Sequence, residues 1–400
     1  MVTDPNYTRR TLLRTGAVVA GTGVLAGCTS EEGNGDGNGD GDETTGNGTG
    51  DGNGNGNGDD DTTDEDTDGN GDDAGGHTAS IEPVGTVEFD AVPETWVADN
   101  GTWADMGVAL GQDPPEGLWL TGRYHTQYYD EIPGLEVSRD GMIDLYDDGV
   151  DLENFYEIDA DVHVMDPNFM ENRYSDTIDE DDIDAIENLG PIFGSTIFSR
   201  DYQWRGEYEY YTLYEAFERL ADVFQEQARY DAFESLHDEF QSRLAEHVSG
   251  EEPEVGVLWP MEDDEFLPYS IDEGTSFKHL NDLGVDDAIA AANISDFHDS
   301  RGRIDYEDVL EIDPDVLLLR GHEHLTTTEF EETVLADLKN HNIASNLTAV
   351  QNDDVYQAGP LHQGPIINLV VTERTAQQLY DVDEQLFDRE RVGEIVTGDL

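Results

Sequence analysis

Arginine and aromatic residues gather in the loops that follow predicted strands in the first half of the chain. These residues are Arg123, Tyr124, His125, Phe169, Arg173, Arg200, Tyr202, Trp204 and Arg205. In open α/β sheets, ligands bind outside the carboxyl ends of the strands. Each arginine alone is more simply explained as a surface ion pair. Arginines interleaved with Tyr and Trp, however, predict a cleft for an anionic or aromatic ligand.

Two histidines offer the nearest approach to metal chemistry. His322 and His324 lie at the end of a predicted strand in the second half of the chain. Side chains at i and i+2 of an extended segment point the same way, so with His125 or His362 they could bind zinc or iron. We favour the alternative that these histidines hydrogen-bond a ligand or the backbone. The sequence contains no Gly-x-Ser-x-Gly, Walker or zinc-protease motif, and we predict no resident cofactor.

The chain is extremely acidic, with a formal net charge of -74 over 400 residues. Carboxylates spread over a whole chain keep it hydrated where salt screens charge over short distances, so the composition predicts adaptation to very high salt. An acidic disordered protein is the alternative, but outside residues 29–80 apolar residues are plentiful and periodic. No basic patch is available to neutralise phosphates, which argues against nucleic acid as a partner.

The N-terminus has the features of an export signal followed by a tether. Arg9 and Arg10 precede a short apolar run, as in twin-arginine signals, and Leu-Ala-Gly-Cys ending at Cys28 has the pattern of a lipobox. We therefore predict a signal peptide over 1–28 and a lipid on Cys28, the only cysteine; an ordinary cleaved signal is the alternative. Residues 29–80 are predicted to be a disordered Gly/Asp-rich tether at the extracellular face of the membrane.

Residues 212–248 carry a long apolar repeat in steps of three and four, which keeps one face of a helix apolar. Thr212 and Glu215 form a capping box, and a Gly and a Pro just beyond the repeat supply a stop. At ~1.5 Å per residue, one unbroken helix here would span roughly 55 Å and cross more than one packing unit. We therefore predict a connecting helix over 211–249, with a coiled-coil arm as the alternative.

Two similar segments flank this helix at a constant offset of 154 residues. Residues 151–165 read DLENFYEIDADVHVM and residues 305–319 read DYEDVLEIDPDVLLL, with seven of fifteen positions identical. Each reads as a short helix, an acidic turn and an apolar strand. Acidic composition does not explain the match of Ile158 with Ile312, so we predict two lobes of similar build. Strands alternating with helices further predict parallel sheets with covered faces.

The predicted fold class is therefore α/β, with two Rossmann-like lobes joined by one long connecting helix. The lobes are assigned to residues 84–210 and 254–382, and residues 383–400 to an acidic tail. This arrangement resembles the substrate-binding lipoproteins of ABC importers, above all the iron–siderophore and cobalamin class (class III) of periplasmic binding proteins. The segments that carry the resemblance are DPDVLLLR at 313–320, NDLGV at 281–285 and NDDVY at 352–356.

The resemblance implies a shallow cleft between the lobes, little hinge bending, and a ferric chelate as ligand. The implied cleft residues are Arg123, Tyr124, Trp204, Arg205, Trp259, Tyr269, Arg320 and His362, with His125 and His322 as further loop candidates. It also implies an acidic residue on each lobe that docks an ABC permease. The predicted function is capture of a ferric siderophore by a monomeric, lipid-anchored receptor that performs no chemistry.

Several alternatives remain open at this point. A receptor of the same import class could carry cobalamin, haem, or free zinc or iron held by His322 and His324. An anchored extracellular enzyme would need a cleft carboxylate with a shifted pKa. The Tyr-rich stretch 202–214 and the GHEH loop at 321–324 depart from common members of the class, which leaves the identity of the ligand open.

Overall fold

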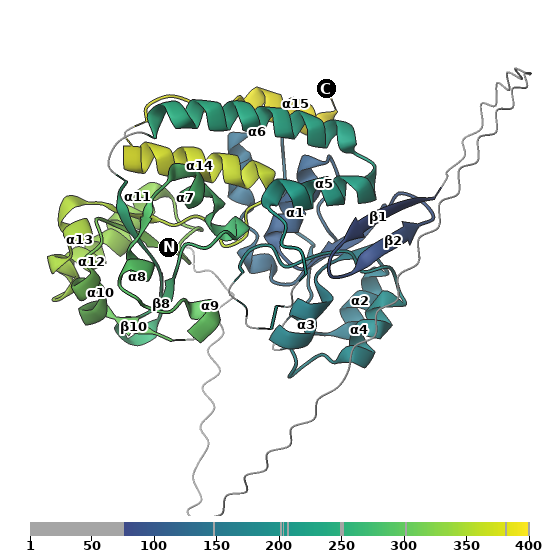
Figure 1. Cartoon of the computed structure of the whole chain (residues 1–400), viewed down its shortest axis with the longest axis horizontal. Coiled ribbons are helices and arrows are strands. Elements are labelled where there is room, and N and C mark those ends of the chain that lie inside the picture. Colours follow the sequence, from purple (N-terminus) through teal and green to yellow (C-terminus); the bar gives the residue numbers. More distant parts are fainter. Residues whose placement is uncertain are drawn as a thin grey trace, which may run out of the picture. The chain divides into compact units, whose positions relative to one another are not determined.

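The computed structural model describes residues 76–398, apart from residues 147, 148, 201, 203, 206, 207, 249–251, 301 and 381. The predicted signal peptide, Cys28 and almost all of the predicted tether lie outside the described residues. The described chain forms two α/β lobes and a group of helices that pack on both (Figure 1). None of its helices is at once long enough and apolar enough to cross a membrane.

The N-terminal lobe is built on a parallel sheet with the strand order β5–β4–β3–β6. Its strands are β3 (Trp96–Ala98), β4 (Gly117–Leu118), β5 (Ile143–Asp144) and β6 (Val162–Val164). Its helices are α1 (Gly101–Ala109), α2 (Leu152–Ile158), α3 (Pro167–Arg173) and α4 (Glu180–Glu187), with 3₁₀ turns η1 (Thr121–Arg123) and η2 (Thr126–Glu131). The parallel sheet confirms the prediction for this lobe.

An antiparallel hairpin of β1 (His77–Ile81) and β2 (Gly85–Phe89) precedes this sheet. Ala79 and Ile81 are buried in the main core, so the folded part begins before residue 80. The predicted boundaries at 80 and 84 were therefore placed too late. Only two apolar residues alternate in β1, and their neighbours are polar, so the sequence pattern is too short to predict the strand.

The C-terminal lobe contains a mixed sheet with the order β10–β8–β7–β11–β12, and β9 also pairs with β7. Its strands are β7 (Glu254–Pro260), β8 (Glu265–Tyr269), β9 (Asp286–Asp287), β10 (Ile304–Asp305), β11 (Val316–Leu319) and β12 (Val355–Gln357). Its helices include α7 (Lys278–Leu283), α8 (Ala288–Ala291), α9 (Phe297–Ser300), α10 (Tyr306–Ile312), α11 (Thr327–Phe330), α12 (Ala336–Asn340) and α13 (Thr348–Asn352). Strands β7, β11 and β12 are parallel, whereas β8 and β10 run antiparallel to their neighbours.

The internal repeat is present in the structure. The pair α2–β6 in the first lobe matches the pair α10–β11 in the second, and each helix ends at an aspartate with left-handed backbone geometry. Asp159 has φ 50° and Asp313 has φ 45°. The prediction of two similarly built α/β lobes is therefore confirmed.

These two aspartates give opposite predictions for the same substitution. Asp159→Gly should stabilise the fold by about 0.5–1 kcal/mol, because glycine adopts the left-handed conformation without strain. Asp313→Gly should destabilise it by about 1 kcal/mol, because the Asp313 carboxylate accepts hydrogen bonds from Thr348 N at 2.7 Å and Thr348 Oγ1 at 2.8 Å. Denaturant unfolding of both variants in concentrated salt would measure the difference, and changes of the same sign would contradict it.

The predicted unbroken helix over 212–248 is wrong. Helix α5 (Leu213–Phe224) ends at Gln225, which has φ 55°, and α6 (Gln227–His247) then runs back against it. The reversal is fixed by ring contacts between Phe217 and Phe233, with centroids 5.9 Å apart, and between Tyr214 and His237 at 4.3 Å. The capping box at Thr212 is present as predicted.

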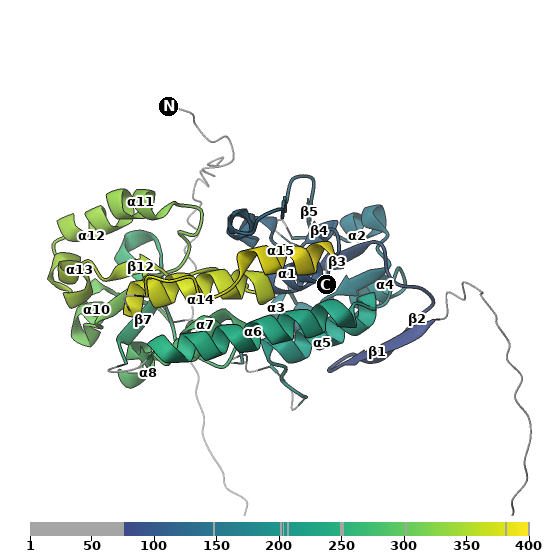
Figure 2. The ribbon, with the colours of Figure 1, turned by 90° about the horizontal axis from the view of Figure 1, so that it is seen from above.

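The two-lobe arrangement does not depend on an unbroken helix, because α6 is long enough by itself to contact both lobes. It lies beside α14 (Pro365–Tyr380), as both views show (Figures 1 and 2). Near its start, Tyr230 packs on Phe217 of α5. Near its end, Gln241 donates a hydrogen bond to Asp282 of α7 at 2.7 Å. The connection therefore consists of a helical hairpin whose longer arm spans the lobes.

The predicted acidic tail at 383–400 is also wrong. It contains α15 (Arg389–Thr397), whose Val392, Ile395 and Val396 are buried in the main core. The helix is held by Arg229 of α6, which donates from Nε to Ile395 O at 3.1 Å. The periodic apolar residues are few and surrounded by acidic ones, so the composition conceals the helix.

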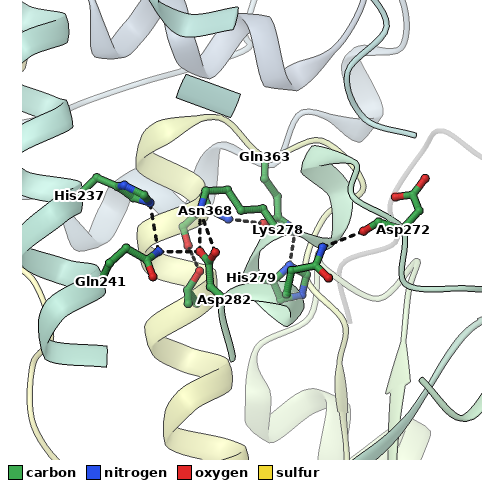
Figure 3. Close-up of polar contacts among 10 residues, drawn as sticks. His237, Gln241, Asp272, Lys278, His279, Asp282, Gln363 and Asn368 are labelled. Atoms are coloured by element: carbon green, nitrogen blue, oxygen red, sulfur yellow. Dashed lines mark hydrogen bonds and ion pairs between the residues drawn. The ribbon is translucent and has the colours of Figure 1, made fainter. Parts of the chain in front are cut away.

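Polar contacts, partly buried, join α6, α7 and the start of α14 (Figure 3). Lys278, one of only two lysines in the chain, pairs with Asp282 at 2.7 Å. Gln363 Nε2 donates to His279 Nδ1 at 3.1 Å, and Asn368 Nδ2 donates to Gln363 Oε1 at 3.2 Å. Burial, helped by the charge of Arg320, lowers the pKa of His279 to about 3, so this histidine is neutral. These bonds fix the second lobe to the spanning helices.

Candidate functional site

A cavity of about 430 Å³ lies where strands of both lobes end. Residues after β3, β4, β5 and β6 form its first wall, and residues at or after β7, β8 and β12 form its second. The lining comprises Asp99, Asn100, Gly101, Trp119, Leu120, Arg123, Tyr146, Phe169, Arg173, Tyr174, Phe198, Tyr202, Trp259, Met261, Leu267, Tyr269, Phe297, Leu361 and His362. The position agrees with the rule that ligands bind at the carboxyl ends of parallel strands.

The first wall is an aromatic cluster. The rings of Trp119 and Tyr146 both lie 4.8 Å from that of Tyr174, measured between centroids. Phe169 makes edge contacts with Tyr174 at 5.7 Å and with Tyr202 at 5.7 Å. Such rings offer flat, polarisable surfaces with few rotatable bonds, which suits a rigid organic ligand.

Two arginines line the cavity beside this aromatic wall. The guanidinium of Arg173 lies over the Tyr174 ring at 5.4 Å, and that of Arg123 lies over Trp259 of the second lobe at 5.5 Å. Both side chains are exposed, and within the described part of the chain neither forms an ion pair. In a chain with 93 Asp and Glu residues, such unpaired guanidinium groups favour an anionic ligand.

The start of α1 adds further positive potential. Asn100 caps this helix by accepting a hydrogen bond from Thr102 N at 2.9 Å, and Gly101 lines the cavity. The first turn of a helix attracts anions because its backbone N–H groups are aligned. A Cβ at Gly101 would lie 3.2 Å from the Tyr124 ring and 3.3 Å from His362, so only a glycine fits comfortably.

Four of the residues predicted from the sequence line the cavity. They are Arg123, Trp259, Tyr269 and His362. Phe169, Arg173 and Tyr202, which the strand-end rule had also singled out, line it as well. The structure therefore brings together residues from both lobes that are far apart in the sequence.

Other predicted residues lie behind the walls or away from them. Tyr124 is buried and hydrogen-bonds Tyr129 at 2.7 Å. Arg320 is 1% exposed and is sandwiched between Tyr269 and Phe277. Trp204 stacks on Tyr202 at 5.1 Å, which makes it a support for the aromatic wall.

The remaining candidates are loop residues outside the lining. Arg205 lies over the rings of Tyr208 and Tyr210 at 4.4 and 4.6 Å. Burial, together with the nearby charges of Arg139, His324 and Arg123, lowers the pKa of His125 to about 4. His322 packs its ring against Phe330 at 5.8 Å.

The alternative of a metal site at His322 and His324 receives no support. Among the described residues, no group of three or more His, Cys, Asp or Glu side chains is placed to hold a metal ion. Burial, then the proximity of His324, lowers the pKa of His322. Two imidazoles without a third protein ligand do not form a typical zinc site.

Sequence reasoning missed Asp99, Trp119, Tyr146 and Tyr174 as lining residues. β4 ends at Leu118, so the indole of Trp119 lies just past the strand end. Tyr146 follows a two-residue strand that the sequence does not reveal. Asp99 could have been found, since it directly follows the apolar strand β3.

Comparison with known proteins gives the class of the molecule. The model of a family described as "Periplasmic binding protein" matches residues 150–360, more than half of the chain. A search of curated proteins found no match. This chain belongs to the periplasmic binding protein family, and its fold is the class III type with two α/β lobes and long connecting helices, as the resemblance had predicted.

Solved structures with a similar fold come from several bacteria. A periplasmic solute binding protein from Mycobacterium smegmatis has a TM-score of 0.54 at 15% identity, covering 78% of this chain and 99% of that chain. The iron uptake ABC transporter substrate-binding protein PiuA from Streptococcus pneumoniae has a TM-score of 0.51 at 17% identity, covering 76% and 98%. A periplasmic binding protein from Veillonella parvula has a TM-score of 0.50 at 15% identity, covering 78% and 94%. At these low identities, the TM-scores show a shared fold alone.

Proposed function

We propose that this chain captures an anionic ferric chelate of the siderophore type and delivers it to the permease of an ABC importer. The observation that carries the proposal is the pair Arg123 and Arg173, unpaired among the described residues, beside an aromatic wall in a cavity of about 430 Å³. Arginine pairs strongly with chelate oxygens, and aromatic rings pack against the organic shell. The protein acts by binding alone in this proposal, without catalysing a reaction.

A titration with a panel of chelates tests the function. Ferric tricatecholate, ferric trihydroxamate and ferric citrate would be added to the protein in concentrated salt, with tryptophan fluorescence as the readout. Trp119 and Trp259 line the cavity, so a bound ferric complex should quench their emission. We expect the most anionic aromatic complex, the tricatecholate, to bind with the highest affinity. Absence of binding by all three complexes would reject the proposal.

We further propose that the chain works as a monomer at the extracellular face of the membrane, exported by the twin-arginine route and anchored by a lipid on Cys28. The Arg-Arg pair, the lipobox and the acidic composition support this location and a high-salt environment. Cys28→Ser should release the protein from the membrane fraction into the medium without changing its ligand affinity. Retention of that variant in the membrane would contradict the lipid anchor.

A further inference from the structure

Two buried aspartates, Asp99 at the cavity wall and Asp166 on the neighbouring connection, differ in their hydrogen bonds. Asp99 follows β3 and Asp166 follows β6, the neighbouring strand. Asp166 is fully buried and accepts hydrogen bonds from four donors, which are Asn168 N, Phe169 N, Thr196 N and the Tyr208 hydroxyl. Both carboxyl oxygens of Asp166 are therefore occupied as hydrogen-bond acceptors.

Asp99 has the opposite surroundings. It is 6% exposed, lines the cavity, and accepts one side-chain hydrogen bond, from Asn100 Nδ2 to Oδ1 at 2.6 Å. The side-chain amide of Asn100 is fixed in this orientation, with Nδ2 toward Asp99, because its Oδ1 caps α1. No hydrogen-bond partner meets Oδ2 among the described residues. This oxygen can therefore carry a proton, and no described residue is placed to accept it.

We propose that Asp99 binds the ligand as a neutral carboxylic acid, donating a hydrogen bond from Oδ2 to an oxygen of the chelate, and that binding weakens when Asp99 ionises. The inference rests on the proposed function, because it assumes that the chelate occupies this cavity. Its physical basis is the contrast between two neighbouring buried carboxyl groups: both oxygens of Asp166 accept hydrogen bonds, whereas Asp99, which lines the cavity, has one oxygen without a partner among the described residues.

The electrostatics of the site agree with this assignment. Burial, and then the negative charge of Asp166, raises the pKa of Asp99 well above its ordinary value of 3.8. Asp166 comes from the β6–α3 connection. The other titratable groups that line the cavity are Arg123, Arg173, His362 and the tyrosines Tyr146, Tyr174, Tyr202 and Tyr269. A neutral acid adds a donor for a chelate oxygen, whereas a carboxylate would repel an anionic ligand.

The direction of the pH effect follows directly. Affinity should be highest on the acid side, where Asp99 holds its proton, and should fall as the pH rises through the pKa of Asp99. The Asp99→Asn variant keeps a neutral donor at this position at every pH. The chelate itself can change its protonation with pH. The ratio of the wild-type to the variant dissociation constant removes this effect, because both proteins are titrated with the same complex at each pH.

The experiment is a titration of wild type and Asp99→Asn with ferric tricatecholate from mildly acidic to alkaline pH in concentrated salt. We expect the ratio of dissociation constants to be near one at the acid end and to rise at least about tenfold at the alkaline end. Asp130→Asn, which removes an exposed carboxylate of η2 outside the cavity, is the matched control and should show a flat ratio. A flat ratio for Asp99→Asn would overturn the inference while leaving the proposed function intact. Absence of binding by both proteins at every pH would overturn the proposed function as well.

A second measurement does not depend on any ligand. The infrared difference spectrum of wild type minus Asp99→Asn at neutral pH should contain the C=O stretching band of a protonated carboxylic acid. Carboxylate bands in its place would overturn the proposal even if the variant changed the stability of the protein.

Discussion

Replacing Arg123 and Arg173 together with glutamine should weaken binding of ferric tricatecholate by about 100-fold or more. Each guanidinium is exposed at the cavity and unpaired within the described chain, so its removal costs no internal ion pair. A charge-assisted hydrogen bond contributes roughly 1.5–3 kcal/mol, so each single variant should lose about tenfold or somewhat more. Isothermal calorimetry is the right measurement, because Arg123 lies over Trp259 and its loss would change the fluorescence itself.

Two controls separate geometry from charge in this experiment. Arg205→Gln removes the same charge from a residue that stacks on Tyr208 and Tyr210 outside the lining, and it should leave the affinity unchanged. Arg173→Lys keeps the charge but loses the planar fork of donors, so it should restore only part of the affinity. Undiminished binding by the double glutamine variant would place the ligand elsewhere or show that it is not anionic.

The features that the sequence predicted correctly are encoded locally. The repeated helix–turn–strand units are recognisable because each carries its apolar residues and its acidic turn within fifteen positions. The loops at strand ends could be found for the same reason, and they led to Arg123, Arg173 and Phe169. The rule that ligands bind beyond the carboxyl ends of parallel strands therefore located the cavity from the sequence.

The features that were missed depend on contacts between distant segments. No glycine or proline marks the reversal at Gln225, and the apolar repeat continues across it. Of the buried residues of α6, Tyr230 and Phe233 pack against Phe217 of α5, whereas the nearby Ala228 is exposed. The side chains that pack against α5 decide which face is buried, and this cannot be read from a single helix.

The same limit applies to the site residues. Arg123 and Tyr124 are adjacent, yet the first is exposed at the cavity and the second is buried against Tyr129. Arg320 directly follows β11, but it lies behind Tyr269, with Nη2 bonded to Ser276 O at 3.1 Å. Position after a strand predicts the neighbourhood of a residue, whereas the direction of its side chain depends on the tertiary packing.

Asp105 should be the residue whose loss destabilises the fold most strongly among the polar residues of α1. It is fully buried, and its carboxyl group accepts hydrogen bonds from Ile366 N at 3.1 Å, Ile367 N at 3.0 Å and the Tyr129 hydroxyl at 2.8 Å. It therefore caps α14, a helix that packs on α1, α6 and α7. Asp105→Ala would leave three buried donors without a partner, which should cost about 3 kcal/mol or more of unfolding free energy.

Asp105→Asn is the matched variant, because it removes the charge and keeps the hydrogen bonds. Burial raises the pKa of Asp105 from 3.8 to about 7 in spite of its donors, so the folded state binds a proton that the unfolded state releases between these values. Stability contributed by this group is therefore fully present below about pH 4 and is lost as the pH rises toward 7. Asparagine can direct its oxygen to the two α14 amides at every pH, and its Nδ2 can donate to the Tyr129 oxygen if the Tyr129 hydroxyl donates to Tyr124 instead.

The unfolding free energy of wild type minus that of Asp105→Asn should consequently fall between pH 4 and pH 7, by roughly 4 kcal/mol at most, and stay constant above that range. Denaturant unfolding in concentrated salt at several pH values measures this difference, and Asp130→Asn controls for the change in net charge. Since the wild-type value includes every other carboxylate in the chain, only the difference isolates Asp105. A difference that does not vary between pH 4 and pH 7 would mean that the pKa of Asp105 is not raised in the folded state, and that the α14 cap is a carboxylate over this range.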